Sequence, residues 1–144
     1  MLILRCIALL GAIATCNVDA LAAPPSLVPL GWRQVTAAGT ARVFVSPDGA
    51  ARIRFGHEAA HSFDKTAFTS KSDEQVTYQE GGKSWFVVSG YRGPEIFYRK
   101  GNLACGGSRW NLIEFRYPRG AKREMDAAVV TVAHNMGAYR NDCG

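Results

Sequence analysis

The sequence predicts an α+β fold in which a curved antiparallel sheet packs against one long C-terminal helix. Short runs of β-branched and aromatic residues recur between residues 32 and 117, separated by brief gaps that contain glycine or proline. After residue 118 the hydrophobic residues recur every three or four positions, which is the helical period. The 144 residues are 47% hydrophobic and 20% charged, which fits one globular domain and excludes disordered, collagen-like and polytopic membrane chains.

The first 22 residues have the features of a cleaved secretory signal. Arg5 precedes an apolar run over residues 6–14, which is shorter than the roughly 20 residues that a membrane-spanning helix needs. Small residues at Ala20 and Ala22 suit a signal peptidase, and two prolines follow. We therefore expect cleavage after Ala22, a single domain over residues 23–144, and a periplasmic or secreted protein.

The four cysteines have different expected roles. Cys6 and Cys16 leave with the leader; lipidation at Cys16 is the alternative, although Thr15 is a poor match to a lipobox. Cys105 and Cys143 remain, and in an oxidising compartment they are expected to form a disulfide. Closing the loop between Cys105 and Cys143 stabilises the domain by about 3–4 kcal/mol in the chain-entropy model. A reactive thiol at Cys105 is the alternative, but its flanking residues match no thiol enzyme.

The N-terminal half of the domain is expected to hold a short strand and a hairpin. The short strand covers residues 32–36, and the hairpin pairs residues 41–45 with residues 51–55 around a turn at Ser46-Pro47-Asp48-Gly49. Val43 and Val45 are expected to share one face of the sheet with Ile53 and Phe55 opposite them. Residues 57–72 are less regular and could hold a short helix.

The remaining strands are expected to form an antiparallel meander. They cover residues 75–79, 84–89, 95–100 and 109–117, with a glycine-rich connection over residues 101–108. The C-terminal helix follows, because hydrophobic residues step by three and four from Met125 through Val129 and Val132 to Met136. Glu124 and Asp126 favour its N-terminus, and Gly137 is its expected end.

Three stretches of the chain carry a family resemblance. They are Pro47–Ile53; Val76–Tyr78 with Trp85–Gly90 and Ile96–Arg99; and Phe115–Pro118 with Asp126 and Val130. Together they resemble a group of small exported bacterial proteins of unassigned function, over about half of the mature chain. The resemblance implies an envelope location and no particular reaction. The order of a sheet, a "YP" strand end and a helix is also similar to the PsbP-like fold, which has noncatalytic binding and assembly roles.

The segment His57-Glu58-Ala59-Ala60-His61 matches the H-E-x-x-H pattern of zinc peptidases. On a helix, His57 and His61 would lie one turn apart and bind Zn²⁺, while Glu58 would activate a water molecule. Asp64 and Glu80 are candidates for a third ligand. However, Phe55-Gly56 reads as a strand end, so His57 would sit at the frayed start of any helix. The favoured interpretation is a solvated loop or short surface helix, with no metal or cofactor, and zinc hydrolysis is the alternative.

A cluster of basic residues surrounds the end of the last strand and the start of the helix. The net charge is +5, and the cluster comprises Arg109, Arg116, Arg119, Lys122 and Arg123, near Trp110 and Tyr117. It could bind a polyanion, although the simpler interpretation is that these residues form a solvent-exposed edge of the domain. In an exported protein the expected partner is an acidic envelope polymer or an envelope protein rather than nucleic acid. The sequence thus predicts a noncatalytic binding or assembly module.

Overall fold

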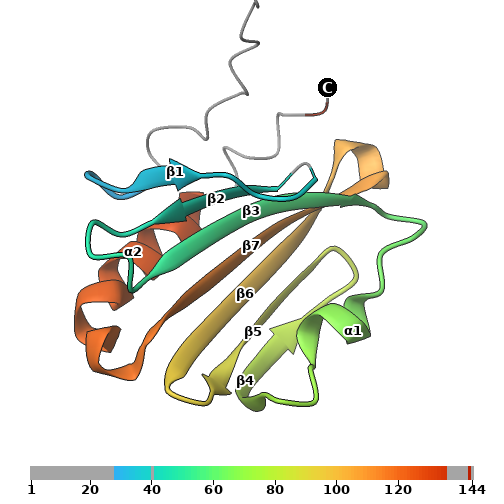
Figure 1. Cartoon of the computed structure of the whole chain (residues 1–144). Coiled ribbons are helices and arrows are strands. Elements are labelled where there is room, and N and C mark those ends of the chain that lie inside the picture. Colours follow the sequence, from blue (N-terminus) through green and yellow to red (C-terminus); the bar gives the residue numbers. More distant parts are fainter. Residues whose placement is uncertain (1–27, 40, 136–142, 144) are drawn as a thin grey trace, which may run out of the picture.

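The computed structural model describes residues 28–39, 41–135 and 143. Within these residues, seven strands form one open antiparallel sheet in the order β1-β2-β3-β7-β6-β5-β4 (Figure 1). The strands are β1 (Arg33–Val35), β2 (Arg42–Val45), β3 (Arg52–Ala59), β4 (Gln75–Gly81), β5 (Trp85–Arg92), β6 (Glu95–Ala104) and β7 (Arg109–Pro118). The predicted α+β class is confirmed. The expected leader and the expected helix end at Gly137 lie outside the described residues.

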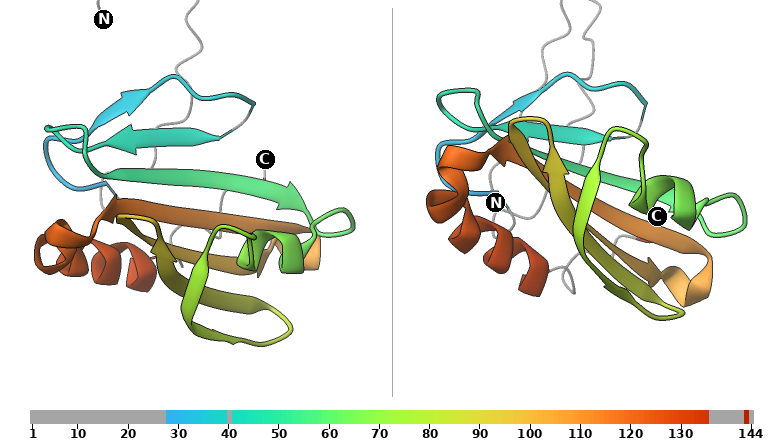
Figure 2. Two further views of the ribbon diagram at one scale, coloured as in Figure 1. Left: turned by 60° about the horizontal axis from the view of Figure 1, so that its bottom comes forward. Right: turned by 90° about the horizontal axis from the view of Figure 1, so that it is seen from below.

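Two helices cover opposite faces of the sheet. Helix α2 (Lys122–Asn135) lies behind the strands in the view of Figure 1, and the short helix α1 (Lys65–Thr69) lies in front of them (Figure 2). Two single-turn 3-10 helices, η2 (Cys105–Gly107) and η3 (Arg119–Ala121), flank β7. Because alternate residues of a strand point to opposite faces, each strand contributes one set of side chains to each helix.

The main core lies between α2 and the sheet. Met125, Val129 and Val132 of α2 are buried, as the three- and four-residue spacing predicts. They pack on residues that share one face of four strands, namely Phe44, Ile53, Phe55, Ile96, Ile113, Phe115 and Tyr117. The Lys100 ammonium also lies on this face and donates to the carbonyl of Ala133 at 2.9 Å.

The β2–β3 hairpin forms as predicted, but its register differs from the expectation. Ser46 donates its backbone N–H to the carbonyl of Ala51 at 2.9 Å, and Gly49 turns the chain with a φ of +74°. This connection places Phe44 opposite Ile53 and Val43 opposite Arg54. Phe44 therefore joins the core with Ile53 and Phe55, while the two valines point to the other face. The expected pairing of Val43 and Val45 with Ile53 and Phe55 was wrong by one residue.

A smaller aromatic cluster fills the space beneath α1. Phe63, just before this helix, and Phe68, within it, contact Phe86 of β5, with ring centroids 6.0 and 5.8 Å away. Trp110 of β7 completes the cluster, 5.4 Å from Phe63. Asp64 caps α1 by accepting the N–H of Ala67 at 3.0 Å. The irregular segment after β3 is thus anchored to the sheet through its phenylalanines.

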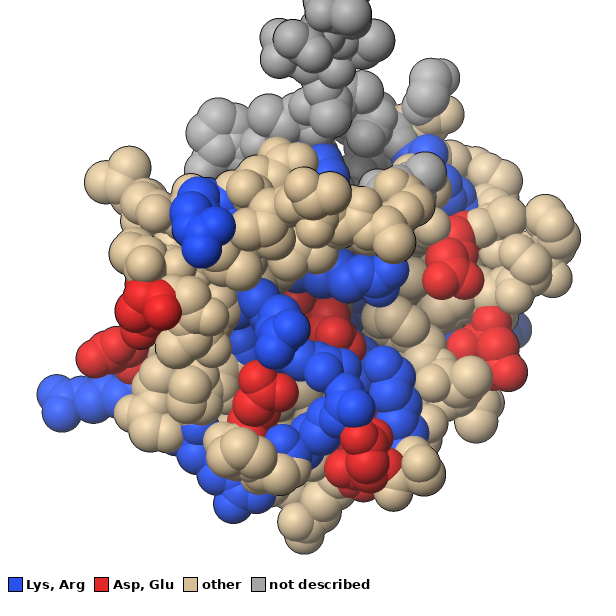
Figure 3. Space-filling model, in the orientation of Figure 1, with Lys and Arg blue, Asp and Glu red and all other residues tan. Residues whose placement is uncertain are grey.

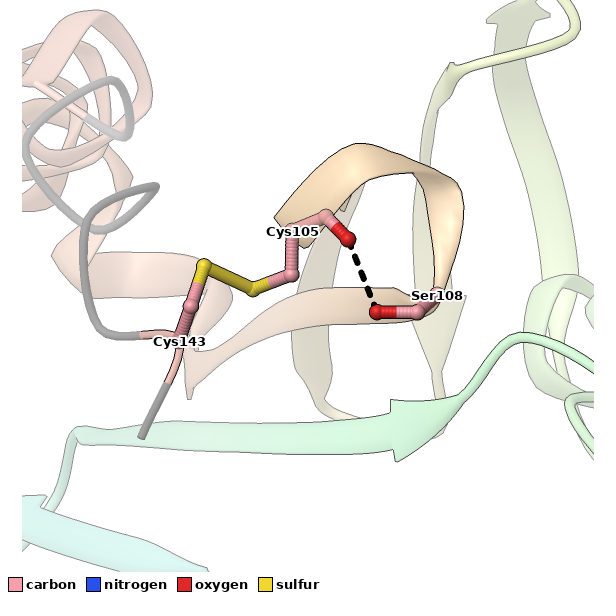
Figure 4. Close-up of a disulfide and its surroundings, with 3 residues drawn as sticks. All are labelled: Cys105, Ser108 and Cys143. Carbon is pink, nitrogen blue, oxygen red and sulfur yellow. Dashed lines mark hydrogen bonds between the residues drawn. A yellow bond between two sulfur atoms is a disulfide. The ribbon is translucent and has the colours of Figure 1, made fainter.

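The disulfide between Cys105 and Cys143 is present, with the two Sγ atoms 2.14 Å apart (Figure 4). Cys105 begins the tight turn from β6 to β7, in which three successive residues have positive φ, including Gly106 and Gly107. Glycine adopts this conformation without a steric penalty, which explains the glycine pair. The Ser108 hydroxyl closes the turn by donating to the Cys105 carbonyl at 2.8 Å.

Strand β6 extends through Gly101, which the sequence analysis assigned to a connection. Gly101 lies directly opposite Phe86 of β5, and a Cβ at Gly101 would stand 2.2 Å from the Phe86 ring. Because Gly101 has no side chain, the Phe86 ring occupies the space that a side chain there would fill. The glycine is therefore a packing requirement within a strand.

We predict that Gly101→Ala lowers the free energy of unfolding by about 1–3 kcal/mol, because the added methyl group overpacks the Phe86 site. Gly56→Ala is the matched control: Gly56 also lies in a strand, but a Cβ there meets nothing within 4 Å. Its effect should stay within about 0.5 kcal/mol. Urea unfolding of both variants measures the difference, and equal stabilities would contradict this packing.

Candidate anion-binding face

Arginine and lysine side chains gather on the sheet face that carries α1. Figure 3 shows them in the hollowed middle of this face, with acidic side chains between them. We call this surface the basic face. Strand pairing and chain position assign to it the buried Arg99 together with Arg33, Arg52, Arg54, Lys71, Arg92 and Arg116.

The strand register brings the charges of the basic face together. Arg52 of β3 lies directly opposite Arg116 of β7. One pair further along, Arg54 lies opposite Glu114, which is itself opposite Arg99 of β6. Side chains at directly opposite positions have Cβ atoms about 5 Å apart. One carboxylate, Glu114, thus stands among three arginines, and Arg52 and Arg116 face each other on neighbouring strands.

Arg99 is the centre of this arrangement and is fully buried. Its Nη1 donates to Glu74 at 2.7 Å, its Nη2 donates to the other oxygen of Glu74, and its Nε donates to Glu114. The guanidinium also lies 4.5 Å from the ring centroid of Phe97. Every nitrogen of Arg99 is therefore occupied, which compensates the cost of burying its charge.

The pKa values of the surrounding groups follow from this geometry. Burial by itself raises the pKa of Glu114, but the Arg99 hydrogen bond and the nearby charges of Arg99 and Arg116 hold it below its usual value. Partial burial, and then the charge of Arg99, lower the pKa of Lys71. The neighbourhood is therefore electropositive, in spite of its two carboxylates.

Several arginines near this centre keep donors available. Arg116 donates its Nε to Glu114 at 3.0 Å, and within the described residues its terminal nitrogens make no other hydrogen bond. Arg52 makes only a long contact of 3.4 Å with Glu95, and its side chain is 53% exposed. Arg54 is exposed and has no ion pair within the described part of the chain. Planar guanidinium groups with free donors suit carboxylate, phosphate and sulfate groups.

The predicted basic cluster is only partly assembled. Arg109 is the first residue of β7 and Arg119 follows its last, and the 10 residues of this strand span roughly 30 Å. Arg119 stacks on Tyr91 at 4.0 Å, and Lys122 pairs with Asp126 at 2.8 Å. Arg119, Lys122 and Arg123 thus adjoin one another near the start of α2, whereas Arg116 belongs to the basic face. The five residues do not form one surface.

The His57–His61 segment does not form the helix that the zinc alternative requires. Its first three residues belong to β3, where His57, Glu58 and Ala59 pair with β7. Consecutive strand residues point to opposite faces, so His57 and Glu58 diverge. Asp64 caps α1 and Glu80 accepts the Tyr78 hydroxyl at 2.5 Å, so both candidate third ligands have other roles. Among the described residues, no three His, Cys, Asp or Glu side chains lie together as metal ligands.

The sequence analysis missed every basic residue of this face except Arg116, namely Arg33, Arg52, Arg54, Lys71, Arg92 and the buried Arg99. The alternation Arg52-Ile53-Arg54-Phe55 was a usable signal, because it places two arginines on the face opposite the core. No local signal marks the contact of Arg99 with Glu74, which lies 25 residues earlier.

Comparisons with known proteins assign no family to this chain. No protein-family model matches it, and a search of curated proteins found no relative. In the described part of the structure, no helix is long and apolar enough to cross a membrane. The site must therefore be interpreted from its own chemistry.

We predict that Glu114→Gln flattens the dependence of stability on pH in acid. The folded-state pKa of Glu114 is lowered, so its charge stabilises the fold above the unfolded-state value of about 4.5 and loses this effect as pH falls through the folded-state pKa. The variant should be about 1–3 kcal/mol less stable at neutral pH. It should lose less stability than the wild type on acidification.

The measurement is urea unfolding at neutral pH and at about pH 3, where a carboxyl of ordinary pKa is protonated. Glu58→Gln, at an exposed position, is the control and should keep the wild-type difference between the two conditions. A Glu114→Gln variant with the full wild-type difference would refute the assigned role of Glu114.

Proposed function

We propose that the protein is an exported, noncatalytic binding module that holds an acidic partner on its basic face. The observation that carries the proposal is the Arg52–Arg116 pair on neighbouring strands beside the exposed Arg54. Like charges directly opposite one another destabilise a sheet. Arg52 and Arg116 each have one carboxylate partner, Glu95 and Glu114, and an anion seated between them would reduce the remaining repulsion and gain charge-assisted hydrogen bonds.

The arrangement favours an extended ligand over a single ion. Arg33 of β1 lies opposite Val45, which lies opposite Arg52, and Arg52 lies opposite Arg116. With strands about 4.8 Å apart, this row places positive charges at about 10 Å and then 5 Å intervals across the sheet. A chain with repeated carboxylate or sulfate groups could contact all three arginines at once.

Two features support export and an envelope partner. The first 22 residues resemble a secretory signal, and Cys105 and Cys143 lie at bonding distance, an arrangement that persists in oxidising compartments. An exported protein with a net charge of +5 meets acidic polymers and acidic protein segments rather than nucleic acid. The proposed partner is therefore an acidic envelope polymer or an acidic segment of an envelope protein.

We predict that Arg52→Gln/Arg54→Gln weakens binding of poly-L-glutamate by about tenfold or more, because each change removes a charged hydrogen-bond donor. Isothermal titration calorimetry of the chain from residue 23 at low ionic strength measures the loss. Added salt should weaken wild-type binding, since exposed charges are screened.

The matched control is Arg119→Gln/Arg123→Gln, which removes the same charge from the cluster near the start of α2. Its loss should be much smaller and should reflect long-range attraction alone. If this control loses more affinity than Arg52→Gln/Arg54→Gln, the ligand binds to the cluster predicted from the sequence, and the basic face is not the site.

A further inference from the structure

A second cleft lies on the opposite face of the sheet, beside the first turns of α2. Helix α2 packs chiefly over β6 and β7, and next to it a cleft of about 190 Å³ opens over β5 and β6. Three tyrosines line it, namely Tyr91, Tyr98 and Tyr117. Because these residues and the basic face use opposite sides of the same strands, the two sites are separate.

The tyrosine hydroxyls in this cleft have hydrogen-bonding capacity to spare. Within the described residues, the hydroxyls of Tyr91, Tyr98 and Tyr117 make no hydrogen bond. They are also not buried, because the only buried side-chain polar atom without a partner in this part of the chain is Arg109 Nε. The three hydroxyls must therefore reach open space. The cleft that they line is that space.

The hydroxyls of Tyr98 and Tyr117 are protonated donors at neutral pH. Burial raises the pKa of Tyr98 to about 12, and burial followed by the charge of Asp126 raises the pKa of Tyr117. Each hydroxyl can thus donate one hydrogen bond and accept others.

The rest of the lining is apolar or electrically balanced. Ile96 and Val129 add apolar surface, and Ser89 adds a further hydroxyl. The two charged residues in the lining, Lys122 and Asp126, pair with each other at 2.8 Å. A neutral ligand is favoured, because an ion would have to compete with this pair.

We propose that the tyrosine cleft binds a neutral hydroxylated ring, specifically one sugar unit. A sugar ring has apolar C–H faces that pack on aromatic rings, and hydroxyl groups around its rim that pair with tyrosine, serine and carboxylate oxygens. The cleft is smaller than the 300–1,000 Å³ typical of sites for drug-sized ligands. It therefore suits a single ring and not a long apolar chain.

The test is a titration of the ¹⁵N-labelled chain from residue 23 with N-acetylglucosamine and with methyl β-glucoside, followed by amide chemical shifts. We expect saturable shifts at Ser89, Tyr91 and Asp126 with at least one sugar, in the millimolar range. Tyr98→Phe/Tyr117→Phe keeps both rings and should weaken binding by about fivefold or more, since two hydrogen-bonding groups are lost.

Tyr78→Phe is the matched control, because Tyr78 does not line the cleft. It should bind the sugar as the wild type does. Asp126→Asn, which changes an exposed side chain, provides a second variant whose binding should weaken if the double variant does not fold.

Two results would overturn the assignment. One is the absence of saturable shifts around the cleft with both sugars. The other is equal binding of phenol by the wild type and by Tyr98→Phe/Tyr117→Phe, which would indicate an apolar pocket. Arg52→Gln/Arg54→Gln should leave sugar binding unchanged, so failure at the cleft is distinguishable from failure of the basic face.

Discussion

The buried guanidinium of Arg99 is the interaction on which the basic face depends. It connects three parts of the chain, because it donates from β6 to Glu114 of β7 and to Glu74 in the segment before β4. Leaving such a buried charge without any partner typically costs about 3–5 kcal/mol, and losing one of the two carboxylates of Arg99 is expected to cost less because the other remains. The cluster therefore fixes the segment that carries Lys71 and Glu74 against the middle of the sheet, and it orients Glu114 toward Arg116.

The same strands serve two different surfaces. One set of alternate side chains builds an apolar core beneath α2, and this core supports the fold. The other set carries arginines, which α1 and its aromatic cluster cover only at one end of the sheet. Placing the charges on paired strands holds them at fixed separations, as loops would not. The tyrosine cleft lies on the same face as the apolar core, in the part that α2 does not cover.

Local sequence patterns predicted the architecture well, whereas the residues of the basic face are brought together by pairing between strands that are distant in sequence. The spacing of Met125, Val129 and Val132 predicted the helix, and the Pro-Asp-Gly turn predicted the hairpin. The pairing register could not be predicted from local sequence, so Val43 and Val45 were assigned to the wrong face. Composition alone assigns an arginine to the surface, but Arg99 is buried because distant carboxylates surround it. Proximity in sequence grouped Arg109 with Arg119, although a whole strand separates them.

Binding of an acidic ligand to the basic face is tested most directly by observing the arginine side chains individually. Nε–Hε NMR signals of the ¹⁵N-labelled protein would be followed while poly-L-glutamate is added. We expect saturable shifts for Arg52, Arg54 and Arg116, and little change for Arg119 and Arg123. Arg99 should keep a strongly protected signal throughout, because its Nε is buried and bonded to Glu114. Shifts confined to Arg119 and Arg123 would contradict binding at the basic face, and rapid solvent exchange at Arg99 would contradict its burial.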